Sequence, residues 1–198
     1  EMINTFEYAI NDRDIRIRQF LAIAMGATGD KRYVETIIKA LDQNDNEIIM
    51  ACAFALGNLK DNRAVEHLLG LLDSGDPQVR LQSVIALGKI EDSRSTMALE
   101  KMLADIEPNV RWDAAVALAK QKNSSGRRII LDLLDRKYLN SFSNIDKVEQ
   151  VQAMMVAINV APLIQDSDLK ASLLELRESD SNLKIREAAR RALLNFEE

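Results

Sequence analysis

The sequence predicts an all-α fold, an α-solenoid in which antiparallel helix pairs repeat along the chain. Apolar residues recur at the spacing of a helix face in successive short segments. Turn-forming residues such as Gly88 and Asp92 separate these segments. The whole pattern then returns at a fixed step of 31 residues, which is typical of repeat proteins.

The stretch from Asp76 to Asp105 shows the repeating unit most completely. Pro77 suits the first turn of a helix, and Gly88 is a plausible C-cap for it. Asp92 can cap a second helix. The apolar face of that second helix would contain Leu99, Met102 and Leu103. Neither helix could bury its apolar face alone, so neighbouring units must pack on one another.

Equivalent positions agree along four units. The leucine of the second helix recurs at Leu41, Leu72, Leu103 and Leu134. The glycine near the end of the first helix recurs at Gly26, Gly57 and Gly88, with Ala119 in the fourth unit. The repeats therefore run over residues 11–42, 43–73, 74–105 and 106–135.

A fifth repeat follows an insertion. Val156 corresponds to Val116 at a step of 40 residues rather than 31, so about nine residues are added within 136–147. We predict an inter-repeat loop there, and such insertions often lie on a binding face. The loop's Tyr138 and Phe142 either pack back onto neighbouring repeats, which we favour, or contact a partner. The fifth repeat then covers residues 146–178, with Pro162 separating its two helices.

Both ends resemble half-repeats. Residues 1–10 match a second helix without its first, and residues 183–193 match a first helix without its second. We expect residues 1–198 to form a single solenoid domain that is a segment of a longer protein. The alternative is a protein whose half-repeats act as caps.

The pairs Val79-Arg80 and Val110-Arg111, followed by Ala86-Leu87-Gly88 and Asp92-Ser93-Arg94, resemble HEAT repeats. The short spacing is similar to the variety called PBS-lyase-like HEAT repeats. The resemblance covers nearly the whole chain and implies the fold, with second helices on a concave face and first helices on a convex one. It implies no specific activity, because such repeats mostly serve as binding scaffolds.

Composition excludes several classes of function. The formal net charge of −5 argues against nonspecific binding to nucleic acid. No apolar run approaches the roughly 20 residues of a membrane span, and no signal peptide is visible, so we expect a cytoplasmic protein without membrane insertion. The single Cys52 excludes an internal disulfide and falls at a core position of a first helix.

The sequence carries no constellation typical of an enzyme. It has no Cys-x-x-Cys motif, no histidine cluster and no glycine-rich phosphate loop. His67 is the only histidine, so the paired His-Glu metal clusters of the HEAT-repeat hydroxylases cannot form. We therefore predict a protein that is not an enzyme and that uses no metal or cofactor.

Charged residues recur at one turn of the repeat. The ladder consists of Asp30, Arg32, Asp61, Arg63, Asp92 and Arg94. It could present a charged rail to a partner. We favour a structural role, in which each Asp caps a second helix and each Arg bonds carbonyls or the next repeat's Asp.

Two surfaces are candidates for partner binding. The first is a convex apolar stripe at two repeated positions of the first helices, with Trp112 partly exposed: Met50, Phe54, Leu81, Ile85, Trp112 and Val116. The competing interpretation buries these residues between repeats. In that case contact would lie on the concave side, around Glu35, Glu66, His67, Met97 and Arg128.

These observations favour a noncatalytic protein-binding scaffold or adaptor. Its partner would be another protein or another domain of the same protein. One alternative is an accessory subunit resembling the phycobilin lyases, although no chromophore-directed residue can be identified. The other is a nucleic-acid-binding HEAT-like protein, which the charge disfavours.

Overall fold

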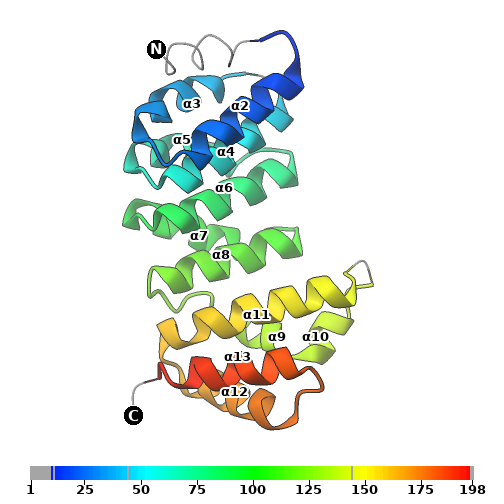
Figure 1. Cartoon of the computed structure of the whole chain (residues 1–198). Helices are drawn as coiled ribbons and strands as arrows, with labels where there is room; N and C mark the ends of the chain where they lie inside the picture. The colour runs from blue at the N-terminus through cyan, green and yellow to red at the C-terminus, as the bar shows by residue number, and fades with distance from the viewer. Residues whose placement is uncertain (1–9, 11, 44, 144, 197–198) are drawn as a thin grey trace. The chain divides into compact units, whose positions relative to one another are not determined.

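A computed structural model describes residues 10, 12–43, 45–143 and 145–196 (Figure 1). Over these residues it contains α-helices and short 3-10 turns and no strand, which confirms the all-α prediction. The predicted second helix at residues 1–10 falls almost wholly outside the described residues. The chain divides into two compact units, residues 1–117 and 118–198, and the single solenoid domain stays a prediction.

Unit 1 alternates long and short helices (Figure 1). The long first helices are α2 (Ile15–Ala27), α4 (Asn46–Leu59) and α6 (Pro77–Ile90), and α8 (Pro108–Lys120) contains the unit boundary. The second helices are α3 (Val34–Ala40), α5 (Val65–Leu71) and α7 (Thr96–Met102). Each second helix follows a 3-10 turn: η1 (Lys31–Tyr33), η2 (Asn62–Ala64) or η3 (Ser93–Ser95). α2 packs against α4, and α4 packs against α6.

Unit 2 contains the fifth repeat and its neighbours. Its helices are α9 (Arg127–Leu134), α10 (Arg136–Asn140), α11 (Lys147–Ile164), α12 (Ser167–Ser179) and α13 (Leu183–Leu193). α11 contacts both α9 and α13. The predicted first helix over residues 183–193 is confirmed by α13.

Glycine at the repeated position serves packing and not capping, so the C-cap predicted at Gly88 is wrong. α6 continues to Ile90 and is capped by Glu91, whose φ of 59° is left-handed. A Cβ at Gly57 would lie 2.8 Å from the Cα of Ala86 on the next first helix. A Cβ at Gly88 would lie 2.7 Å from the Cβ of Ala117. The glycines therefore let consecutive first helices approach closely.

The inserted segment is not simply the predicted loop, because residues 136–140 form α10. Asp135 caps this helix by accepting a bond from the backbone N–H of Lys137, and Leu139 anchors it in the interior. The rings of Tyr138 and Phe142 are half-buried and meet edge to face, with 5.1 Å between their centroids.

Pro162 does not separate the helices of the fifth repeat, contrary to the prediction. It lies within α11, which ends at Ile164 with Gln165 in a left-handed conformation. Proline has no backbone N–H, so α11 lacks the hydrogen bond that this position would otherwise donate to the carbonyl of Ile158. The Gln165 amide also donates to the carbonyl of Pro162 at 2.6 Å.

The core is built from the repeated apolar positions. Cys52 belongs to it, as the sequence predicted: it is fully buried in α4, and burial raises the pKa of its thiol to about 12. Equivalent leucines of the first helices are also fully buried, at Leu56, Leu87 and Leu118. So are equivalent residues of the second helices, at Ile37, Leu68, Leu99 and Ile130.

Candidate functional site

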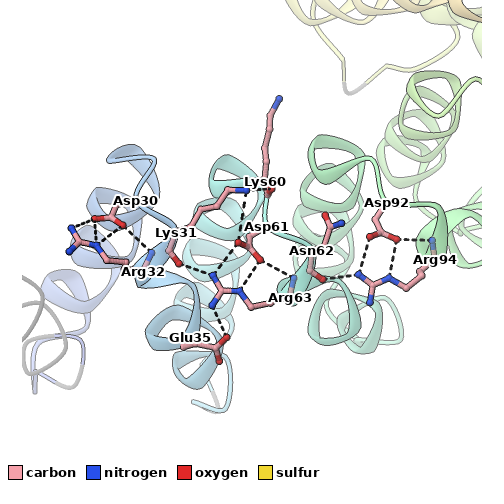
Figure 2. Close-up of polar contacts among 10 residues, drawn as sticks. All are labelled: Asp30, Lys31, Arg32, Glu35, Lys60, Asp61, Asn62, Arg63, Asp92 and Arg94. Carbon is pink, nitrogen blue, oxygen red and sulfur yellow. Dashed lines mark hydrogen bonds and ion pairs between the residues drawn. The ribbon is translucent and has the colours of Figure 1, made fainter.

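The Asp–Arg ladder lies at the starts of the second helices in unit 1 (Figure 2). Each aspartate accepts a bond from the backbone N–H of the arginine two residues later, at 3.0 Å for Arg32 and Arg63 and 2.9 Å for Arg94. The arginine side chain then folds back onto the same carboxylate. Each pair thus satisfies one N–H at the start of a 3-10 turn.

The arginines also join consecutive repeats. Arg63 Nη2 donates to the carbonyl of Lys31 at 2.9 Å, and its Nη1 donates to Glu35 Oε1 at 3.1 Å (Figure 2). Arg94 repeats both bonds one unit later, to the Asn62 carbonyl at 2.9 Å and to Glu66 at 3.3 Å. The arginines of the ladder therefore bond backbone carbonyls, as the structural interpretation predicted. Their carboxylate partners lie in each arginine's own repeat and the preceding one, not in the next.

Both partners of the ladder stay charged. Hydrogen bonds from the Arg63 side chain lower the pKa of Asp61, although partial burial acts in the opposite direction. Hydrogen bonds from the side chain and backbone of Arg94 lower the pKa of Asp92 in the same way. The bonded aspartates raise the pKa of each arginine in turn.

A second set of arginine contacts, which sequence reasoning missed, joins first helices to the loops between repeats. Arg80 on α6 donates to both carboxylate oxygens of Asp105, at 2.8 and 2.9 Å, and to the carbonyl of Ser74 at 2.9 Å. Arg18 on α2 bonds Gln43 across the same separation of 25 residues. That shared separation is the signal that could have revealed the set.

Unit 2 forms the equivalent pair with an arginine from the insertion. Asp180, like Asp105, precedes a first helix and accepts a bond from the backbone N–H two residues later. The repeated arginine is absent from α11, which has Val151 at the position of Arg80. Arg136 at the start of α10 donates to Asp180 instead, at 2.6 and 2.7 Å.

The predicted convex stripe is interrupted. Trp112 is only 8% exposed and Val116 is also buried, so the prediction that Trp112 is partly exposed is wrong. Met50, Leu81 and Ile85 are half-buried. Burial removes apolar area from water, and Trp112 has the largest apolar area of these side chains to bury.

One member of the stripe does remain exposed. Phe54 on α4 is 39% exposed, and the ammonium of Lys89 lies 4.7 Å from the centroid of its ring. This cation covers part of the ring face. The first helices of unit 1 therefore present no continuous apolar strip at these positions.

The alternative residues lie at the surface. Glu35, Glu66, His67 and Met97 are exposed on α3, α5 and α7, and we call this surface of unit 1 the second-helix face. Met97 is 72% exposed and occupies the repeat position of Glu35 and Glu66. Arg128 is exposed on α9 in unit 2, where it pairs with Asp132 at 3.2 Å.

The second helices of unit 2 contribute to a groove of about 590 Å³. α9 contributes Leu131 to it, α10 contributes Lys137, and α12 contributes Ser172 and Glu175. The Arg136–Asp180 ion pair forms part of its wall, so the insertion shapes this groove.

The described residues include potential metal ligands and one thiol. Within them no three His, Cys, Asp or Glu side chains group as a metal site would require. The Cys52 thiol is buried and its raised pKa disfavours the reactive thiolate. None of the described helices is both long and apolar enough to span a bilayer.

Comparison with known proteins identifies solved structures that have a similar fold. No curated protein matches the sequence as a relative. The complex of CpcE and CpcF of phycocyanin lyase from Nostoc sp. PCC7120 has a similar structure, with a TM-score of 0.67 and 20% identity over 97% of this chain and 74% of the other. A designed armadillo repeat protein in complex with the peptide (KR)4 has a TM-score of 0.57 and 19% identity over 100% of both chains.

These structural similarities, at such low identity, show the fold alone. The family model for HEAT repeats matches residues 3–78 and 66–139, which together span more than half of the sequence. Those matches include the repeated Val-Arg, Ala-Leu-Gly and Asp-x-Arg positions. The chain therefore belongs to the HEAT-repeat proteins.

Proposed function

We propose that this chain is a noncatalytic scaffold that binds another protein, or another domain of its own protein, through the second-helix face of unit 1. The observation that carries the proposal is the exposure of Met97 in a row of equivalent positions. A flexible, polarisable methionine side chain adapts to the surface of a partner, and exposing it to water has a free-energy cost that binding would remove.

The polar members of the row are suited to recognition. Arg63 holds Glu35, and Arg94 holds Glu66, so both carboxylates have one preferred position before a partner arrives. Groups that are already positioned lose less conformational entropy on binding. The row therefore offers two positioned acceptors and one apolar contact at regular intervals.

The similar structures agree with a binding role for this fold without assigning one to this chain. The designed armadillo protein is in complex with a peptide, and CpcE is in complex with CpcF. The likeness to the lyase complex concerns the fold alone and does not favour a lyase-like function here.

The test begins with the intact protein as bait, followed by titration of the purified partner. Met97→Glu places a charge at the centre of the proposed contact, and we expect affinity for the partner to fall at least tenfold. Ile106→Glu is the matched control, because Ile106 lies in the same unit, is also exposed and precedes α8. Equal affinity of wild type and Met97→Glu would show that the partner binds elsewhere.

A further inference from the structure

A groove of about 420 Å³ lies between α11 and α13, on the first helices of unit 2. Met155 and Ala188 supply apolar surface, and Lys184 and Arg191 supply charge. Leu183 also lines the groove and is 69% exposed, so it adds apolar surface that a bound molecule could cover.

The repeat register explains why a groove occurs at this place. Asn159 on α11 stands where the earlier first helices have Gly26, Gly57 and Gly88. At Gly57 even a Cβ would lie only 2.8 Å from the backbone of the next first helix, so a whole asparagine side chain requires a wider separation. Asn159 lines the groove, as this argument requires.

The facing helix contributes a small side chain to the same space. Aligning Ile185-Arg186 of α13 with Val79-Arg80 of α6 places Ala188 at the position of Gln82. The methyl group of Ala188 thus stands where α6 has the side chain of Gln82, which is longer by three heavy atoms. A wider separation on one side and a smaller side chain on the other leave room for a side chain from outside.

The charges around the groove are mainly positive. Glu187 accepts bonds from Arg190 at 2.9 Å and from Arg191 at 2.7 Å, so two cations share one carboxylate. Lys184 lines the groove as well and adds a further positive charge. The α11 residues that line the groove, Met155 and Asn159, carry no charge. This positive region contrasts with the net charge of −5 for the whole chain.

We propose that this groove binds an acidic amphipathic helix of a partner protein. A bulky apolar side chain of that helix would contact Met155 and Ala188 beside Leu183, and its carboxylates would pair with Lys184 and Arg191. An apolar floor with charges at its edge is the usual arrangement for recognition of a helix in a groove. The proposal concerns another unit and other helices than the second-helix face, so it stands independently of the proposed function.

The probe is a fluorescein-labelled amphipathic peptide of about 18 residues, with leucine along one helix face and glutamate elsewhere. Fluorescence polarisation with the full chain measures its affinity. We expect Ala188→Leu, which fills the groove without changing charge, to weaken binding at least tenfold. We expect Lys184→Glu to weaken binding severalfold and to reduce its dependence on salt.

Two matched controls separate the groove from general charge effects. Arg177→Glu makes the same change of charge at an exposed position of α12 and should leave the affinity for the probe unchanged. A second peptide with lysine in place of every glutamate should not bind. If Ala188→Leu fails to fold by circular dichroism, Ala188→Gln replaces it, because the corresponding position of α6 already carries glutamine.

Three results would overturn the proposal. The first is no measurable binding of the acidic peptide to the wild-type chain. The second is unchanged affinity in folded Ala188→Leu, which would mean that the peptide does not enter the groove. The third is displacement of the peptide by double-stranded DNA of equal charge as effectively as by unlabelled peptide, which would indicate a general polyanion surface.

Discussion

Replacing Arg80 by methionine tests how the first helices are joined to the loops between repeats. The Arg80 side chain is 12% exposed and the side chain of its partner Asp105 is 6% exposed, so solvent screens this pair weakly. Methionine keeps the apolar stem of the side chain but removes both bonds to Asp105 and the bond to the Ser74 carbonyl. A buried carboxylate is left without its cation.

Removing one partner of a buried ion pair typically costs about 3–5 kcal/mol. Asp105 still accepts a bond from the backbone N–H of Glu107 at 2.9 Å, which places the expected loss for Arg80→Met near about 3 kcal/mol. Arg63→Ala is the control, because its side chain is 48% exposed. We expect that variant to lose about 1 kcal/mol or less and to keep partner binding.

The pH dependence checks the same reasoning. The bonds from Arg80 hold the pKa of Asp105 below its ordinary value, and burial acts in the opposite direction. The stability supplied by this pair is therefore fully present above the unfolded pKa of about 3.9, and it is lost as pH falls through the lowered folded value. The difference between wild type and Arg80→Met should shrink accordingly in acid.

Urea unfolding followed by far-UV circular dichroism measures both variants, and Asp105→Asn completes a double-mutant cycle with Arg80→Met. A coupling energy near zero would refute the reasoning. So would a loss of stability for Arg80→Met no greater than that of Arg63→Ala.

The remaining predictions concern the core. Trp112→Ala should lose about 3–5 kcal/mol in urea unfolding through the cavity it leaves, and Trp112 emission should be blue-shifted; a red-shifted, iodide-quenchable emission would contradict its burial. Gly57→Val should lose at least about 1–3 kcal/mol, since its Cβ would lie 2.8 Å from the Ala86 backbone; a variant as stable as wild type would disprove the close approach. Native Cys52 should resist a thiol reagent at neutral pH until urea unfolds the chain, and rapid labelling would show that it is accessible.

The sequence by itself was sufficient for the fold class and most helix positions. The reason is that helical periodicity and capping are properties of short segments, and a 31-residue repeat shows the same local signals several times. Asp92 was identified as a cap from its position alone, although it caps the 3-10 turn η3 that leads into α7 and not α7 itself. An N-cap bonds N–H groups only two or three residues away, so a local pattern can reveal it. Buried Cys52 could likewise be read from its position in the repeat.

Tertiary structure alone decided which surfaces are free. Trp112 is buried although Phe54, at the other repeated position of the stripe and on α4, is 39% exposed, so a periodic position alone could not reveal which of these side chains is covered. Gly88 has the same local signature whether it caps a helix or admits a neighbour, and only the approach of Ala117 distinguishes the two roles. Arg136 pairs with Asp180 across 44 residues, outside any repeat period, because the insertion changed which residues meet. Pairings of this kind depend on the packing of separate helices, which no local pattern specifies.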